Sequence, residues 1–516
     1  MRALLSVYDK VGLEAFAKGL ASLDIELVAS GGTARALSEA GVAHLTVEAV
    51  TQAGEMLGGR VKTLHPAVHG GILADLDQPS HLAELEAAGI TPISLVACNL
   101  YPFQAEPSVE TIDIGGPTMV RSAAKNYAHV TVVVDPADYG SILDELRNEG
   151  EITATTRLAL ARKAFAHVAA YDAAIVNWFD SPAVAGRPGQ GALPATLHIS
   201  IERVQDLRYG ENPHQVGARY RDSSDLGRAG VWDSALQHGG RELSYLNLFD
   251  ADAAWRLVHE VAALPPRGER AAAAVIVKHA NPCGVAIAGS LADAYAKAFA
   301  GDPLSAFGGI VALSQGVDEE LAEQIVANPL ADVLVAPGYT EVAVDLLVSK
   351  RKNMRVLTLA PPGAAGLALR QIDGGWLVQE ADQVNLRLDD WRCVTEREPS
   401  AEQWRDAQLA WLVCARTSSN AIVLARDGQV VGIGCGQQSR VDAARLAAGK
   451  AGDRARGGAG ASDAFFPFRD GLDAVADAGA SVVVQPGGSL RDDEIVAAAD
   501  ERGLAMVMTG ERHFRH

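Results

Sequence analysis

The chain has 516 residues, 48% of them apolar and 5% aromatic, and its 45 Lys+Arg against 64 Asp+Glu give a formal charge of −19. This negative charge disfavours nucleic acids and anionic membranes as partners, and the shortage of aromatic side chains disfavours stacking on single-stranded bases. Since roughly 100–200 residues make one domain, a chain of this length is expected to hold more than one.

The five cysteines are scattered and none belongs to a C-x-x-C pair, which disfavours a disulfide framework or a thiolate zinc site. A reducing, cytoplasmic setting is therefore expected. The first ten residues, MRALLSVYDK, contain only a short apolar run, too little for a signal peptide. No stretch approaches the roughly 20 apolar residues that a membrane-spanning helix needs.

The first part of the chain alternates strand-like and helix-like patterns. Apolar runs predict strands and amphipathic spacing predicts helices: strands at 3–7, Ile25–Ala29, Ile93–Cys98 and Val130–Val134, and helices at Val11–Leu23, Ala34–Ala40 and Arg157–Ala170. This alternation is typical of a mostly parallel sheet with helices on both faces. The segment Ser181–Pro194, rich in Gly, Pro and Ala, predicts a boundary between domain 1–190 and domain 191–516.

The string SGGTARAL (Ser30–Leu37) follows a predicted strand and opens a predicted helix, with Thr33 expected as its N-cap. Its two glycines expose backbone N–H groups at the positive end of the helix dipole, which makes an anion site, although an ordinary capped turn has the same pattern. Ser6 and Lys10 follow the first strand, so a parallel sheet brings them to the same carboxyl edge.

The string GRVKTLHPAVHGG (Gly59–Gly71) concentrates positive charge in an otherwise acidic protein, through Arg60 and Lys62. These cations fit either an anion site or a solvated basic turn. His65 and His69 have the i,i+4 spacing of a helical zinc pair, but the glutamate of H-E-x-x-H is absent, so no metal is expected here.

Two further strings follow the predicted strand that ends at Cys98. NLYPF places Asn99 and Tyr101 at the end of that strand, and DIGGPTMVRSAAKN adds Asp113, a Gly-Gly turn and Lys125. Each fragment alone also fits packing or solvated surface. Together they gather a carboxylate, a phenol and several cations, which suits proton transfer and the stabilisation of an oxyanion.

Across residues 1–190 these strings resemble the inosine monophosphate (IMP) cyclohydrolase domain, which has a methylglyoxal-synthase-like (MGS-like) fold. The resemblance implies a dehydrating ring closure without a metal or redox cofactor. It implies that Lys62, Tyr101, Asp113 and Lys125 surround the reacting groups. It also implies a set of substrate-binding residues: Ser6, Lys10, Ser30, Gly32, Thr33, Arg60, Thr63 and Asn99. Tyr8 and Gly58 depart from the family pattern, which has Ser and Asp there.

The second part of the chain contains VIVKHANPCGVAI (Val275–Ile287), a buried strand pattern that ends in Lys278-His279. A His and a Pro-Cys belong to the zinc-deaminase signature, H-x-E and P-C-x-x-C, but the glutamate and the second cysteine are missing here. A similar texture recurs in Ser418–Arg440, so a duplicated α/β unit is expected. The string GDRARGGAGAS (Gly452–Ser462) has the composition of a flexible loop.

The strings LRYGENPHQ, KHANPCG, DPLSAFGG, SDAFFPFRDG, QPGGSLRDDE and RHFRH resemble aminoimidazole carboxamide ribonucleotide (AICAR) formyltransferase. Essentially the whole chain is thus similar to the bifunctional purine-biosynthesis family that joins the two activities. The resemblance implies a duplicated, cytidine-deaminase-like second domain without zinc, 10-formyltetrahydrofolate as cosubstrate and a homodimer. Some relatives also hold a structural potassium ion.

The resemblance also implies residue roles in the second domain. Lys278, His279 and Asn420 correspond to catalytic positions, and Thr417 stands beside Asn420 where some relatives have Lys. The positions that correspond to nucleotide and folate contacts are Arg208, Tyr209, Gly309, Asp332, Phe468 and Arg512. Phe468 and its aromatic neighbours fit core packing as well as a pterin contact.

Formyl transfer explains the Lys278-His279 pair in physical terms. The amine of AICAR is a weak nucleophile and must lose a proton as it attacks the formyl carbon, a role that suits a histidine. Lys278 is expected to keep the imidazole neutral by charge repulsion and to donate to the formyl oxygen or the leaving nitrogen. Two other hypotheses stay open: a zinc-dependent deaminase or amidohydrolase with an MGS-like regulatory domain, and a non-catalytic nucleotide-sensing scaffold.

Overall fold

The computed structural model describes residues 1–181, 184, 193–223, 230–264, 271–329, 331–364, 366–384 and 386–516. The chain forms two compact units, Met1–Glu202 with Arg221–Arg228 and Arg203–Tyr220 with Ala229–His516. The predicted boundary at Ser181–Pro194 falls mostly outside the described residues and stays a prediction. None of the helices in the described ranges combines the length and apolar content that a bilayer crossing needs.

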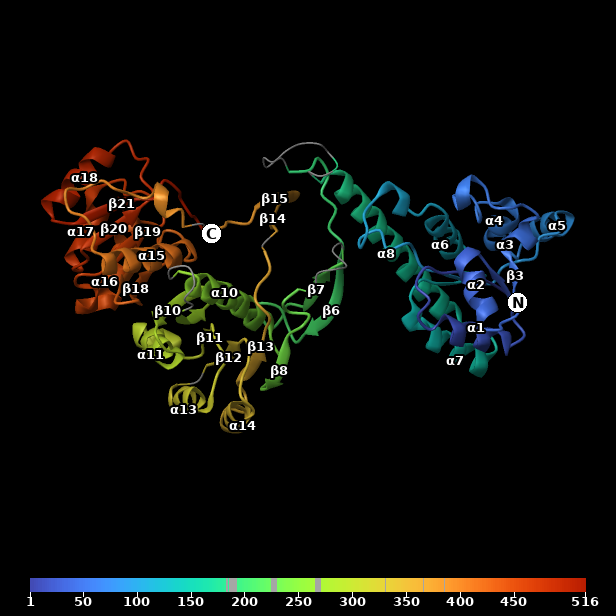
Figure 1. Ribbon diagram of the computed structural model, residues 1–516, viewed down its shortest axis with the longest axis horizontal. Coiled ribbons are helices and arrows are strands. Elements are labelled where there is room, and N and C mark those ends of the chain that lie inside the picture. The colour runs from blue at the N-terminus through green and yellow to red at the C-terminus, as the bar shows by residue number, and fades with distance from the viewer. Residues whose placement is uncertain are drawn as a thin grey trace. The chain divides into compact units, whose positions relative to one another are not determined.

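The first unit contains a five-stranded, all-parallel sheet in the order β3-β2-β1-β4-β5, which confirms the parallel α/β prediction (Figure 1). Its elements are β1 (Arg2–Ser6), α1 (Leu13–Ala21), β2 (Glu26–Ala29), α2 (Gly31–Glu39), β3 (Leu45–Thr46), α3 (Val47–Thr51), α4 (Pro66–Leu73), α5 (Pro79–Ala87), β4 (Leu95–Cys98), α6 (Gly115–Lys125), β5 (Thr131–Val133), α7 (Tyr139–Glu149) and α8 (Ala154–Phe179).

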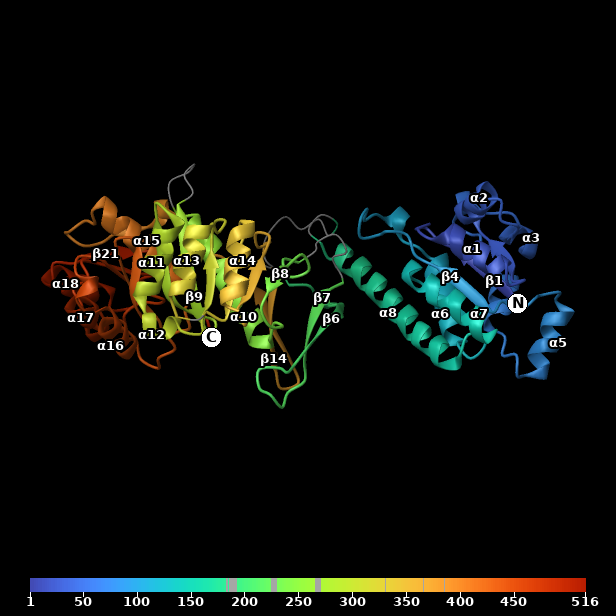
Figure 2. The same cartoon turned by 90° about the horizontal axis from the view of Figure 1, so that it is seen from below.

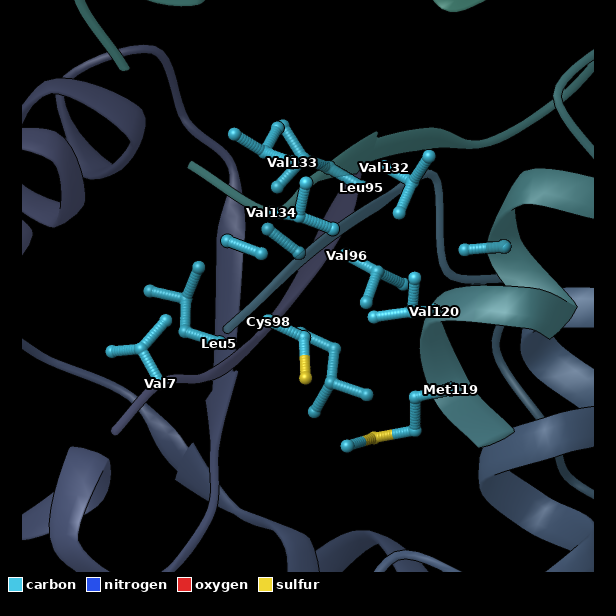
Figure 3. Close-up of a cluster of buried hydrophobic side chains, with 14 of the residues drawn as sticks. Leu5, Val7, Leu95, Val96, Cys98, Met119, Val120, Val132, Val133 and Val134 are labelled. Carbon is cyan, nitrogen blue, oxygen red and sulfur yellow. The ribbon is translucent and has the colours of Figure 1, made fainter. Parts of the chain in front are cut away.

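The core of this unit forms where the apolar strands meet the apolar faces of the helices. Val96 of β4 and Val132 of β5 are fully buried, and Met119 and Val120 of α6 face them (Figure 3). Full burial of such side chains contributes about 1.5–3 kcal/mol each. Cys98 lies in the same cluster, and burial raises the pKa of its thiol, so this cysteine is a core residue rather than a nucleophile.

The second unit contains a twelve-stranded sheet, counted within the described residues, in the order β16-β21-β20-β19-β17-β18-β10-β9-β11-β12-β13-β8. Its strands are β8 (Leu236–Gly239), β9 (Ala272–Lys278), β10 (Asn281–Ala288), β11 (Ile310–Leu313), β12 (Val333–Ala336), β13 (Arg355–Thr358), β16 (Arg392–Cys393), β17 (Ile422–Arg426), β18 (Gln429–Gly434), β19 (Ala459–Ser462), β20 (Val482–Gln485) and β21 (Ala505–Met508).

This sheet consists of two equivalent halves. In the part of the chain that the structure describes, each half has six strands, which can be numbered one to six in chain order. From the centre of the sheet to its edge, both halves place these strands in the order three, two, four, five, six, one. In both halves the successive pairings are antiparallel, antiparallel, parallel, parallel and antiparallel. The halves join through the antiparallel pair β10 and β18. The similar textures of the two strings therefore reflect a real duplication, as predicted.

Helices cover both faces of the sheet. Helices α10 (Tyr245–Ala262) and α15 (Ala401–Ala415) share one core cluster with one face of the strands. The opposite face is covered in the first half by α11 (Leu291–Gly301), α13 (Glu319–Ala327) and α14 (Glu341–Lys350), and in the second half by α16 (Arg440–Ala451), α17 (Arg469–Asp477) and α18 (Asp492–Glu501). Figures 1 and 2 show α10 and the trio α11, α13 and α14 on opposite sides of β9–β13.

Glycines let α11 and α16 approach the central strands closely. A methyl group on Gly284 of β10 would overlap the carbonyl oxygen of Ala298, and one on Gly434 of β18 would overlap that of Ala443. The prediction of a flexible loop at Gly452–Ser462 is wrong, because this segment contains the buried strand β19. Its small residues serve the same close packing, since a methyl group on Gly458 would overlap the backbone of Ala425.

Two short antiparallel sheets complete the described part. One pairs β6 (Ile201–Leu207) with β7 (Gly217–Asp222), and the other pairs β14 (Leu367–Ile372) with β15 (Gly375–Glu380). The β14–β15 hairpin exposes large apolar side chains, including Trp376 at 61% and Leu377 at 57% of their maximal surface.

Candidate active sites

The carboxyl ends of β1 and β2 meet in the first unit, as the sequence predicts for a parallel sheet. Ser6 Oγ lies 2.8 Å from Ser30 Oγ. The expected N-cap role of Thr33 is wrong, because α2 begins two residues earlier and Ser30 occupies the N-cap position. Thr33 instead lies inside the helix, where its Oγ1 accepts from Val7 N at 2.9 Å and donates to Val7 O at 3.0 Å. The threonine thus fastens the two strand ends together.

Two lysines lie beside the Gly31-Gly32 turn. A Cβ on Gly31 would come 3.2 Å from Lys62 Nζ, and one on Gly32 would come 3.8 Å from Lys10 Nζ. Gly31 has φ +43°, a conformation that glycine adopts without strain. Two ammonium groups therefore lie near the N-terminus of α2, and Lys62 Nζ also pairs with Glu55 Oε2 at 2.6 Å. Cations at a helix N-terminus suit an anionic group such as a phosphate, which would compete with Glu55 for Lys62.

Asn99 and Tyr101 extend this site from the end of β4. Asn99 Oδ1 accepts from the backbone N–H groups of Tyr8 and Asp9, at 2.6 and 3.0 Å, so the residue shapes the loop after β1. Tyr101 is exposed, and its ring meets that of Tyr8 edge to face with 5.7 Å between centroids. Tyr8, one of the departures from the family pattern, therefore contacts a predicted catalytic residue.

Asp113 caps the start of α6. Its Oδ1 accepts from Gly116 N at 2.8 Å, and its own N–H donates to the phenol of Tyr171 at 2.7 Å. Burial raises the pKa of the Asp113 carboxyl, and the N–H groups of Gly116, Tyr101 and Gly115 partly oppose this. A carboxylate with a raised pKa is a better proton acceptor than an exposed one.

Thr63 reaches the same helix start, because a Cβ on Gly115 would lie 2.9 Å from Thr63 Oγ1. Arg60 and Lys125 lie outside the contacts that join the other residues in the described part. Arg60 pairs with Glu110 at 2.5 Å, and both side chains are exposed. Lys125 is the exposed last residue of α6, about 15 Å along the helix axis from Gly115.

In the second unit, Lys278 ends β9 and His279 opens the two-residue turn to β10, so the predicted strand end is a hairpin. The His279 side chain is exposed. Lys278 Nζ donates to Phe307 O at 2.9 Å, which holds the ammonium beside the turn. Both His279 and Ala280 have left-handed backbones, with φ +53° and +55°.

The loop that carries Asn420 lies against this hairpin. Ser418 N donates to Asn281 Oδ1 at 2.9 Å, and Arg515 Nη1 donates to the carbonyl oxygens of Ala280 and Arg416 at 2.7 and 2.6 Å. Asn420 Nδ2 donates to Gln437 O at 2.9 Å. The antiparallel union of the two halves thus brings the loop that carries Asn420 against the Lys278-His279 hairpin, with Ser418 as the contacting residue.

Gly309 and Asp332 continue the same edge of the sheet. A Cβ on Gly309 would lie 3.0 Å from Val277 O, so only a glycine fits beside β9 without displacement. Asp332 N donates to Gly309 O at 2.9 Å, and Arg355 N donates to Asp332 O at 3.1 Å. The edge therefore runs without a break from the Lys278-His279 hairpin to Arg355.

Arginines gather at the end of this row. Burial lowers the pKa of Arg355; the charge of Asp332 opposes this, while the charges of Arg241 and Arg208 add to it. Arg208 and Arg241 line a cavity of about 230 Å³. Arg208 also stacks on Tyr209, with the guanidinium 4.7 Å from the ring centroid. Guanidinium groups bind phosphate through paired hydrogen bonds, so this end of the edge suits a phosphate.

Phe468 and Arg512 come from the second half of this unit. Phe468 is 53% exposed and lies under the guanidinium of Arg491 at 4.7 Å, whereas its neighbour Phe466 is fully buried in the core. Arg512 lines a groove of about 760 Å³ and stacks on Phe514. The aromatic cluster thus divides into a packing residue and an exposed ring.

The residues tied to the zinc-deaminase hypothesis have other surroundings. Cys283 packs against the core under α11, and burial raises the pKa of its thiol to about 12. His65 Nδ1 accepts from Ala67 N and thereby caps α4, while His69 contacts Ser122. Within the described ranges, the ligand atoms of Asp75, Asp77 and His129 lie within 4.8 Å of one another, and this group contains none of the predicted site residues.

Several residues at these sites escaped the sequence analysis. Asp250, Asn281, Arg241, Arg355 and Arg515 act through backbone or long-range contacts. No local motif marks such contacts. The duplication could have pointed to Asp250, because an alignment of the two halves places Asp250 and Asp406, two acidic residues, at equivalent positions on equivalent helices.

The chain is an α/β protein of two compact units, each with a cluster of polar and charged side chains at the edge of a sheet. The model of the AICARFT/IMPCHase bienzyme family matches residues 123–450, and that of the MGS-like domain matches residues 12–121. The chain therefore belongs to the AICARFT/IMPCHase bienzyme family. Among solved structures it is similar to one described as "Crystal structure of ForH", with 41% identity over 35% of this chain and 98% of that chain, and a TM-score of 0.33.

Membership of this family establishes the activity. The protein transfers a formyl group from the cosubstrate 10-formyltetrahydrofolate to AICAR, then dehydrates and cyclises formyl-AICAR to IMP in purine biosynthesis. The deaminase and scaffold hypotheses receive no support from these matches.

Proposed function

We propose that the first unit carries the cyclohydrolase site and the second unit the formyltransferase site, with domains 1–190 and 191–516. The observation that carries this assignment is the Lys278-His279 hairpin. It presents an exposed imidazole beside a fixed ammonium, and the loop that carries Asn420, from the other half of the duplicated sheet, contacts this hairpin through Ser418 and Asn281. These are the groups that a formyl transfer needs.

In the formyl transfer, the amine nitrogen of AICAR forms a bond to the formyl carbon, and the bond from that carbon to N10 of the folate breaks. His279 takes a proton from the amine nitrogen, and N10 gains a proton as it leaves. Lys278 and Asn420 stabilise the charge that develops on the formyl oxygen. Arg208, Tyr209 and Arg512 hold the nucleotide, Gly309 lines the substrate site, and Asp332 and Phe468 contact the folate.

In the cyclisation, the carboxamide nitrogen bonds to the formyl carbon. The formyl oxygen leaves as water with one hydrogen from the carboxamide nitrogen and one from the formamido nitrogen. Asp113 accepts a proton, and Lys62 and Tyr101 donate to the departing oxygen, while Lys125, at the far end of α6, adds positive charge near the anionic substrate. The substrate is held by Ser6, Lys10, Ser30, Gly32, Thr33, Arg60, Thr63 and Asn99. Neither reaction uses a catalytic metal, and a structural potassium ion takes no part in these steps.

We also propose that the protein is a cytoplasmic homodimer. The apolar side chains that β14 and β15 expose support this, because burial of Trp376 and Leu377 against a second copy would remove a large apolar area from water. Light scattering of the purified protein tests the dimer. A monomer at micromolar concentration would contradict it.

The division of labour is tested by one pair of variants. His279→Ala should abolish formyl transfer and leave the cyclisation of supplied formyl-AICAR intact. Asp427→Ala is the matched control, because Asp427 occupies the equivalent turn of the second half with φ +52°, so the backbone strain of the substitution is the same. If His279→Ala removes both activities from a folded protein, or leaves formyl transfer unchanged, the assignment is wrong.

A further inference from the structure

The turn that presents His279 has an unfavourable backbone. His279 and Ala280 are consecutive residues with φ +53° and +55°, and neither is glycine. Left-handed conformations are costly for residues with a Cβ, so a tertiary contact must hold this turn in place.

Asp250 of α10 supplies that contact. Its Oδ2 accepts from His279 N at 3.1 Å and its Oδ1 from Ala280 N at 2.8 Å, so one carboxylate binds both N–H groups of the turn. Asp250 is 8% exposed. Burial raises the pKa of this carboxyl, and the two N–H groups oppose the shift. Hydrogen bonds to a buried carboxylate are among the strong ones in proteins.

The second half of the sheet repeats this arrangement. Asp406 of α15 accepts from Asp427 N at 3.0 Å and from Gly428 N at 2.9 Å, in the turn between β17 and β18. There, however, the second residue of the turn is Gly428, which adopts a left-handed backbone without strain, whereas the turn of the first half has Ala280 at that position. The catalytic hairpin therefore depends more on its carboxylate than its counterpart does.

We infer that Asp250 is a positioning residue for formyl transfer, which fixes the His279 backbone and thereby aims the imidazole at the amine of AICAR. This inference rests on the proposed role of His279 as the base. A displacement of about 1 Å in a catalytic group can lower a rate by about 100-fold. If the turn loses its hydrogen bonds to Asp250 and His279 shifts, the rate of the chemical step should therefore change more than the affinity for the substrate.

The test compares Asp250→Asn with Asp406→Asn in the full-length protein. Asparagine keeps one acceptor oxygen and turns an NH₂ group toward the other N–H, so each variant loses one of the two hydrogen bonds between its carboxylate and its turn. We expect Asp250→Asn to lower kcat of formyl transfer by 10- to 100-fold while KM for AICAR stays within 2-fold and cyclisation is unchanged. Asp406→Asn should lower the melting temperature by less than Asp250→Asn does and keep kcat within 2-fold.

Equal losses of kcat in both variants, or an unchanged kcat in Asp250→Asn, would overturn the inference. If Asp250→Asn does not fold, the double variant Asp250→Asn, Ala280→Gly relieves the strain of the turn; a normal kcat there would also overturn it, and a reduced kcat would support it. His279→Ala is measured alongside. Formyl transfer that survives His279→Ala contradicts the proposed base itself, which separates the two failures.

Discussion

The substitution Gly116→Ala tests the cyclohydrolase site through packing alone. A methyl group on Gly116 would overlap the carboxylate of Asp113 and lie 2.7 Å from Leu100 Cδ2. Leu100 is buried and cannot yield easily, so the carboxylate must move by roughly 1 Å to restore ordinary contact. A shift of this size in a catalytic group costs about 10- to 100-fold in rate, or about 1.4–2.7 kcal/mol of transition-state stabilisation.

The assay follows IMP formation from supplied formyl-AICAR, with formyl transfer by the same chain as the internal reference. The matched control is Gly140→Ala in α7, where a methyl group meets no atom within 4 Å and should stabilise the helix by about 0.5–1 kcal/mol. A folded Gly116→Ala protein that cyclises within 2-fold of the parent would refute the role of Asp113. An equal loss of formyl transfer would show that the damage is not local.

Further expectations concern catalysis, pH, stability and metals. Lys62→Ala should make formyl-AICAR accumulate during turnover of AICAR, as measured by chromatography. Lys18→Ala, on the exposed face of α1, should cause no such accumulation. Burial raises the pKa of Asp113, so its carboxylate becomes protonated at a higher pH than an exposed Asp, whose pKa is about 3.9. The cyclisation rate should therefore begin to fall at a higher pH on acidification. Asp113→Asn should remove most of the activity and also this decline of the rate at acidic pH. Gly434→Ala should destabilise the second unit by about 1–3 kcal/mol through overlap with Ala443 O, with Gly449→Ala, which meets no atom within 4 Å, as its control in denaturant titrations. Prolonged dialysis against a zinc chelator should leave both activities unchanged, and reversible loss would contradict the metal-free proposal.

The parts of the sites that follow strands could be predicted from the sequence. Ser6 ends β1, Ser30 and Asn99 come directly after β2 and β4, and a parallel sheet brings such positions together whatever the loops do. Lys62 could not be placed in this way, because it lies in a long connection and its approach to Gly31 depends on tertiary packing.

The second site was harder to predict for a similar reason. The strand pattern before Lys278 was clear, but the pairing of β10 with β18, which brings the loop that carries Asn420 against the hairpin, has no local signal. The Gly452–Ser462 segment shows the converse error. Its small residues suggested mobility, yet glycines in a strand also permit close backbone contact, and composition alone does not separate the two.

The duplicated sheet has a consequence for biogenesis. Among the described residues, the strand pairings of the first half lie within Leu236–Thr358 and those of the second within Arg392–Met508, so each half can pair its own strands as soon as its residues have left the ribosome, whereas the core that α10 and α15 share needs both halves. Among the described strands, only β10 and β18 pair across the two halves. The loop that carries Asn420 can reach the His279 hairpin only after this pairing forms, so a nascent or truncated chain that holds the first half alone would have the histidine without that loop.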